Sequence, residues 1–179
     1  MHRHRSSRLA WCWALLAGLW STPLSAQAPA PDQALAELKA QIVFRTLLFI
    51  EWPAGQLRPG QALSLCLLED GPLATALMGL AGRTVNGHAL EPRRLRADQA
   101  SACHAALLGP ATDTGPLQQA GRALLLVSDA PAMLGRGVML NLQVEDGRVV
   151  FDVGLTSAHR AGLEFSTKLL RLARFVQRS

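Results

Sequence analysis

Three short stretches of the chain are apolar at nearly every position, without the alternation of a strand that has one face in water. These stretches are residues 62–68, 103–109 and 123–129. Continuous apolar runs of this length are typical of strands that are covered on both faces. Each run ends in a small or acidic turn and a proline near the start of a helix, as in LLEDGPL, LLGPATDTGPL and LLVSDAPAM. This pattern predicts parallel strands joined by helices.

Apolar residues at helical spacing predict three helices around these strands. The first runs from Asp32, a candidate N-cap, to Trp52, because Pro53 does not continue a helix. The second covers residues 72–82 and has proline at its first position, where proline is favoured. A short third helix is predicted around residues 115–121.

The segment 138–155 shows a different pattern. Its apolar and polar residues alternate on both sides of Asp146-Gly147, a pair that favours the two-residue turn of an antiparallel hairpin. An irregular strand with a turn at Asn86-Gly87 precedes it in the chain. The sequence thus predicts a single compact α/β domain. Its mixed sheet has a parallel strand–helix–strand core, flanking helices and a C-terminal antiparallel hairpin followed by helix.

Two helices are expected after the hairpin. Thr156 can cap a short helix that ends at Gly162, and Ser166 can cap a second helix. The spacing of the second helix places four apolar residues on its inner face: Leu169, Leu172, Ala173 and Val176.

The first residues have the order of a secretory signal peptide: three arginines, an apolar run over residues 9–20, and small residues around 25–30. We therefore predict a cleaved signal peptide over residues 1–28, a short spacer over 29–33 and one domain over 34–179. An uncleaved anchor is the alternative, but the apolar run is shorter than the ~20 residues of a membrane-spanning helix. The chain is thus expected to be exported.

The number and distribution of charged residues indicate which classes of partner can be expected. The chain has 18 Lys and Arg against 13 Asp and Glu, but three of the arginines belong to the leader. Residues 159–179 hold five basic residues and one acid, Glu164. Tyrosine is absent and Trp52 is the only tryptophan after the leader, whereas nucleic-acid-binding proteins combine larger basic patches with aromatic residues. No nucleic-acid partner is therefore expected, and the basic segment is interpreted as a solvated face or as a contact with a membrane surface or partner.

Two cysteines, Cys66 and Cys103, remain after the leader. In an exported chain such a pair favours one disulfide bond. A metal site that also uses His88 and His104 is an alternative, although no ligand spacing of the CxxC kind is present. Two free buried thiols are a further alternative.

Ligand-binding candidates lie where the apolar strands end. Asp70, Ser128 and Asp129 follow two of these strands, and ligands of open α/β sheets collect outside the carboxyl ends of strands. The alternative is that they cap the helices that follow. Trp52 is either a packing anchor or a contact for a ligand or partner. No nucleophile elbow, Walker loop, Rossmann glycine triplet or HExxH sequence is present, so we predict no catalytic residue, metal or cofactor.

Several segments resemble those of the YfiR-like periplasmic proteins and occur in the same order. They are KAQIVFRTLLFIEWP, LSLCLLED, GRTVNGHALEPRRL, ACHAALLG, LLLVSDAP and RVVFDVGLTSAHRAGLEFSTKLLRLA. The similarity covers about residues 34–176. It implies a periplasmic protein of a Gram-negative bacterium with a compact α/β fold, often dimeric. Of the family's functional residues only Cys66 and Cys103 carry over, as a disulfide on whose integrity activity depends.

The resemblance also implies a function. The best-known member of that family represses an inner-membrane diguanylate cyclase by binding its periplasmic sensor part, and so lowers cyclic di-GMP and biofilm formation. We therefore expect a non-enzymatic regulator whose partner is the periplasmic domain of a membrane diguanylate cyclase or histidine kinase. The alternative is a periplasmic small-molecule-binding protein with its site at the strand carboxyl ends, around Asp70 and Asp129.

The chain departs from the family pattern in two places. Some relatives carry a second cysteine pair near the C-terminal hairpin, whereas residues 138–155 contain no cysteine. Many relatives are expected to have asparagine where this chain has Gly154. Any redox response would thus depend on one bond, and a contact made by that asparagine is not expected here.

Overall fold

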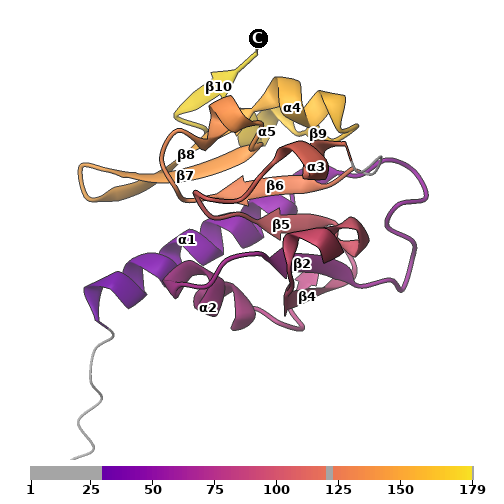
Figure 1. The fold of residues 1–179 in the computed structure, drawn as a ribbon, viewed down its shortest axis with the longest axis horizontal. Helices are drawn as coiled ribbons and strands as arrows, with labels where there is room; N and C mark the ends of the chain where they lie inside the picture. Colours follow the sequence, from indigo (N-terminus) through magenta and orange to yellow (C-terminus); the bar gives the residue numbers. More distant parts are fainter. Residues whose placement is uncertain (1–29, 120–122, 179) are drawn as a thin grey trace, which may run out of the picture.

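The computed structural model describes residues 30–119 and 123–178, so the predicted signal peptide lies outside the described residues. A separate strand pair consists of β1 Ile50–Glu51 and β9 Glu164–Phe165. The strands of the main sheet are β2 Leu63–Leu67, β3 Thr84–Val85, β4 His88–Arg94, β5 Ala105–Leu107, β6 Leu125–Ser128, β7 Leu140–Glu145, β8 Arg148–Gly154 and β10 Phe175–Gln177. Their order across the sheet is β10-β8-β7-β6-β5-β2-β4-β3 (Figure 1).

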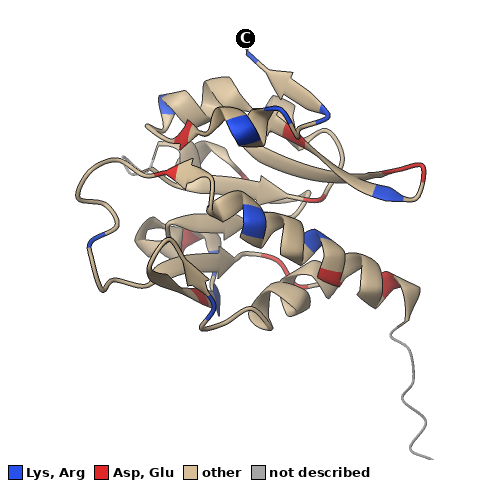
Figure 2. Ribbon diagram, turned by 180° about the vertical axis from the view of Figure 1, so that it is seen from behind, with Lys and Arg blue, Asp and Glu red and all other residues tan. Residues whose placement is uncertain are grey.

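Helices cover both faces of this sheet. The α-helices are α1 Pro31–Leu47, α2 Pro72–Met78, α3 Gly115–Gln118, α4 Leu155–Arg160 and α5 Thr167–Leu170; the 3₁₀ helices are η1 Ala97–Ala102 and η2 Met133–Arg136. The long α1 crosses one face and packs against α2 and β8 (Figure 2). The short α3 lies on the opposite face, as Figure 1 shows.

The apolar runs form the parallel core that the sequence predicts. β4, β2, β5, β6 and β7 are parallel neighbours. All residues of β5 and β6 are buried, as expected for strands that are covered on both faces. The α/β architecture, with its parallel segment and C-terminal hairpin, is therefore confirmed.

Both predicted tight turns are present. Asp146 and Gly147 join β7 to β8, and Asn86 and Gly87 join β3 to β4. All four residues have positive φ, between 48° and 87°. Two consecutive residues of this kind form the turn whose twist matches that of an antiparallel hairpin.

The first helix differs from the prediction at both ends. It begins at Pro31, inside the predicted spacer, with Ala30 rather than Asp32 as its N-cap. It ends at Leu47 rather than Trp52, because the next residues turn and form β1. The partner of β1 is β9, which lies more than 100 residues further along the chain, so local helical spacing could not reveal it.

The C-terminal segment also differs from the prediction. The helix expected from a Thr156 cap begins at Leu155, after Gly154. Ser166 does cap α5, because its Oγ accepts a hydrogen bond from the N–H of Leu169, 3.2 Å away. However, α5 ends at Leu170, and residues 175–177 form β10, parallel to β8. The predicted inner face is therefore wrong: Leu169 is buried, whereas Leu172 is 65% exposed.

Candidate functional site

Cys66 and Cys103 form a disulfide bond, with their Cα atoms 6.0 Å apart and both residues 1% exposed. Cys66 lies in β2, and Cys103 follows η1 shortly before β5, the strand that pairs with β2. The bond therefore joins two positions of the sheet core and encloses α2, β3, β4 and η1. Because the two sulfurs are bonded to each other, they do not form the alternative metal site with His88 and His104.

The buried side chain of His104 follows Cys103 directly and connects the sheet to the loop over residues 53–62. The backbone N–H of Ser64 lies 3.1 Å from Nδ1 and donates to it, so Nδ1 carries no proton. The proton is then on Nε2, which lies 3.3 Å from the backbone oxygen of Gln56. These two contacts hold the loop against the amino end of β5.

Trp52 lies at this same amino end of β5. Its Nε1 lies 3.4 Å from the backbone oxygen of His104 and donates to it. The half-buried ring packs against the core and lines a shallow cavity of about 320 Å³ with Pro53 and Leu57. The structure therefore gives Trp52 a packing contact, and places it at the opposite end of the strands from the other candidates.

The predicted strand-end residues have different environments. Ser128 is fully buried; its Oγ donates to the backbone oxygen of Leu108 at 2.8 Å and so shapes the turn after β6. Asp129 pairs with Lys39 of α1, with Nζ and Oδ2 2.6 Å apart. Asp70 points into solvent, with 85% of its side chain exposed, and pairs with Arg94. None of them caps the helix that follows.

Glu69, which the sequence analysis did not single out, is half-buried and lies near enough to Asp129 for their charges to interact. Burial, and then the charge of Asp129, raise the pKa of the Glu69 carboxyl, while Lys39 opposes them. A Cβ atom at Gly109 would lie 2.4 Å from Oε2 of Glu69, so the glycine makes room for this carboxyl group. The position of Glu69 directly after an apolar strand, next to Asp70, was the available signal.

An open cavity of about 610 Å³ lies beside Glu69, outside the carboxyl ends of β2 and β5. Its lining also includes Gly109, Pro110, Pro116 and Leu117. The position agrees with the general rule for ligand sites in open α/β sheets. Of the four candidates from the sequence, none lines this cavity.

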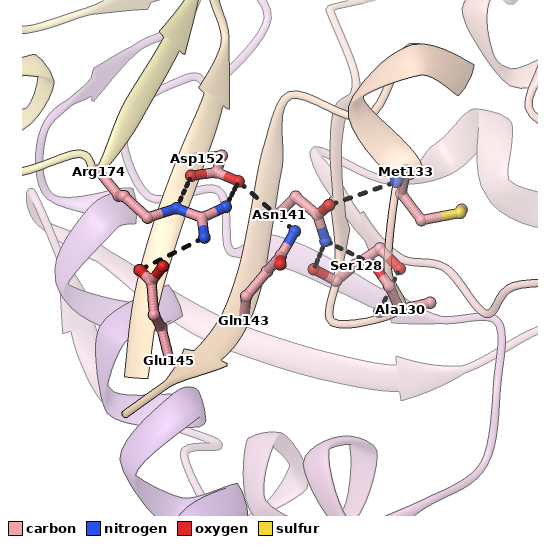
Figure 3. Close-up of polar contacts among 8 residues, drawn as sticks. All are labelled: Ser128, Ala130, Met133, Asn141, Gln143, Glu145, Asp152 and Arg174. Atoms are coloured by element: carbon pink, nitrogen blue, oxygen red, sulfur yellow. Dashed lines mark hydrogen bonds and ion pairs between the residues drawn. The ribbon is translucent and has the colours of Figure 1, made fainter. Parts of the chain in front are cut away.

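The C-terminal hairpin carries a polar network that the sequence analysis did not assemble (Figure 3). Asp152 of β8 is 3% exposed, and both of its oxygens contact the guanidinium of Arg174, with Nε and Oδ1 2.8 Å apart. Glu145 lies 3.4 Å from the same guanidinium. The hydrogen bonds that Arg174 donates to Asp152 hold the pKa of the guanidinium above its usual range. This pair fastens the segment before β10 to β8, where the backbone N–H of Arg174 also donates to the oxygen of Phe151.

Asn141, which pairs in register with Asp152, continues this network into the core. Its Nδ2 donates to the backbone oxygens of Ser128 and Ala130 at 3.0 and 2.8 Å, and its Oδ1 accepts from the N–H of Met133. One fully buried amide thus satisfies three backbone groups of the β6–η2 loop. The asparagine between Leu140 and Leu142 in VMLNLQV was the signal for this role.

The model of the YfiR/HmsC-like family, DUF4154, matches residues 36–174. The chain belongs to this family. No curated protein matches it. A solved structure, titled as a conserved domain protein from Vibrio cholerae O1 biovar El Tor strain N16961, is similar at 12% identity with a TM-score of 0.49. The similarity covers 79% of this chain and 60% of that protein's length.

The surroundings of Gly154 favour glycine at this position of the chain. At Gly154, where asparagine was expected in many relatives, a Cβ atom would lie 2.6 Å from the backbone oxygen of Val138. The backbone of this chain is therefore built around glycine at that position.

Within residues 30–119 and 123–178, no helix has the length and apolar character needed to span a bilayer. The same residues contain no group of three or more His, Cys, Asp or Glu side chains placed to hold a metal ion.

Proposed function

We propose that this YfiR/HmsC-like protein is a non-enzymatic periplasmic regulator that binds the periplasmic sensor domain of an inner-membrane diguanylate cyclase and represses it. The observation that carries the proposal is the family match over residues 36–174, together with the buried Cys66–Cys103 bond. The leader-like residues 1–28 support export, which would bring the protein to the same compartment as that sensor domain.

The surface offers contacts to such a partner. Among the described residues, large apolar side chains are exposed at Leu38, Met78 and Val144. A regulator that binds one conformation of the sensor more tightly than the other shifts the population toward it. The disulfide would keep the binding shape by stabilising the sheet on which the helices pack.

Deleting the gene and measuring cyclic di-GMP tests the proposal. Cells that lack the protein should contain more cyclic di-GMP and attach more readily to surfaces, and a plasmid copy should reverse both effects. Crosslinking in the periplasm, followed by mass spectrometry, should identify a membrane diguanylate cyclase as the bound protein. Unchanged cyclic di-GMP in the deletion strain would reject the repressor. A histidine kinase among the crosslinked proteins would keep a regulator and change its partner.

A second candidate function is the binding of a small molecule. The specific observation that favours it is the cavity of about 610 Å³ beside Glu69, at the carboxyl ends of β2 and β5. Screening small molecules by thermal shift tests it: a ligand of the cavity should raise the melting temperature of the wild-type protein but not that of a Gly109→Leu variant. Gly135→Leu is the matched control, because a Cβ atom at Gly135 meets nothing within 4 Å.

A further inference from the structure

The end of the molecule that carries α4, α5 and β10 is unusually basic. Residues 155–178 contain five basic residues and one acid. Figure 2 shows blue ribbon in several places around these elements. Arg174 is neutralised by Asp152 and Glu145. In contrast, no carboxylate among the described residues lies within ion-pair distance of the other four, which are all exposed: Arg160, Lys168, Arg171 and Arg178.

Two large apolar side chains protrude from the same segment. Leu172 is 65% exposed and Phe175 is 54% exposed. Leu169 is buried in the core, and α5 ends at Leu170. Lys168, Arg171 and Leu172 are exposed. Phe175 begins β10, the edge strand of the sheet. We define these five residues, Lys168, Arg171, Leu172, Phe175 and Arg178, as the C-terminal face.

We propose that the C-terminal face binds the surface of an anionic phospholipid bilayer. The three unpaired cations of this face would contact headgroup phosphates, while Leu172 and Phe175 would enter the boundary between headgroups and acyl chains. Phe and Leu are the kinds of side chain that segments lying on a membrane bury at this boundary. The protein would thus lie on the membrane that holds the partner named under the proposed function. The periplasmic location used here rests on that proposed function.

The composition of the face favours a bilayer over a folded protein. The core of a stable protein–protein interface is depleted of charge, and each partner buries roughly 800 Å². Here three cations without counter-ions surround two apolar side chains. An anionic bilayer supplies counter-charge at every position and requires no shape match. Because only three charges contribute, binding should be weak, reversible and sensitive to salt.

Co-sedimentation of the purified mature protein with lipid vesicles tests the proposal. At low salt, the protein should bind vesicles of phosphatidylglycerol and phosphatidylcholine in equal parts, and should not bind vesicles of phosphatidylcholine alone. Each basic residue near such a surface strengthens binding about fivefold, so Lys168→Glu with Arg171→Glu should weaken it at least 25-fold, roughly. Phe175→Ser should weaken binding to the anionic vesicles without changing its dependence on salt.

The matched control is Arg58→Glu with Arg148→Glu. Both arginines are exposed, and neither has an ion pair among the described residues, so the change in net charge is the same. The control should bind almost as well as the wild type. Failure of the wild type to bind anionic vesicles, or equal losses in both charge variants, would overturn the proposal. So would a dimer that Phe175→Ser dissociates in analytical ultracentrifugation, because a second copy would then cover the face.

The result of the vesicle experiment does not depend on the result of the cyclic di-GMP experiment that tests the proposed function. A deletion that leaves cyclic di-GMP unchanged removes the repressor but does not alter vesicle binding by the purified protein. Conversely, a protein that ignores vesicles can still repress its partner from solution.

Discussion

Breaking the disulfide should cost the protein a large part of its stability, and the size of the loss follows from the structure. The bond joins residues separated by 37 positions. Closing a loop of this length restricts the unfolded chain enough to stabilise the folded state by about 4 kcal/mol. Urea unfolding of the double variant Cys66→Ala with Cys103→Ala, followed by circular dichroism, measures this loss. With a slope of roughly 2 kcal/mol per molar urea, the midpoint should fall by about 2 M.

The reduced wild-type protein is the control, because it keeps both sulfur atoms and loses only the bond. It should unfold near the same urea concentration as the double variant. A loss below about 1 kcal/mol in both would refute the loop-entropy argument. A loss in the double variant alone would instead assign the effect to the packing of the two buried side chains. In cells, the destabilised protein should be cleared by proteases, so that either single variant resembles the deletion strain.

Three further predictions concern polar and glycine positions. Arg174→Met should lower the melting temperature, because it leaves the buried carboxylate of Asp152 without its cation, and a second change of Asp152 to Asn should recover part of the loss. Glu69→Gln should stabilise the protein near neutral pH, because the raised pKa of Glu69 means that folding disfavours its charged carboxylate. This cost disappears as the pH falls below the usual glutamate range, so the melting temperatures of the variant and the wild type should converge in acid. Gly154→Asn should cost about 1–3 kcal/mol in urea unfolding, whereas Gly135→Asn, in open space, should cost less; equal effects would contradict the packing argument.

The parts of the fold that could be predicted from the sequence are those set by neighbouring residues. Continuous apolar runs identify β2, β5 and β6, since a strand covered on both faces has no polar side. Asp146-Gly147 and Asn86-Gly87 identify two turns, because few other residue pairs adopt two positive φ angles. In contrast, β1 and β10 owe their structure to distant partners, β9 and β8, and their own residues fit a helix equally well.

Some features of the candidate site could likewise be predicted from the sequence, whereas others depend on contacts between distant residues. Export and a pair of cysteines were enough to propose Cys66–Cys103, since compartment chemistry decides the pairing. The sequence identifies the acids at the strand ends but does not show which of them lie together. The packing of α1 brings Lys39 to Asp129, whereas Asp70 lies in solvent. Likewise, Asp152 and Arg174 are 22 positions apart, and their contact depends on a strand that the spacing of the segment predicted as a helix.

The disulfide also makes one part of the chain a covalent ring. Residues 66–103 form this ring, which contains one edge of the sheet, β4 and β3, and the exposed residues of η1. A protease that cuts one exposed peptide bond inside the ring opens it without releasing a fragment, because the two pieces stay joined through sulfur. The cut protein keeps its full mass until it is reduced. A protein with this ring can therefore be cut at an exposed residue of η1 and still remain one molecule.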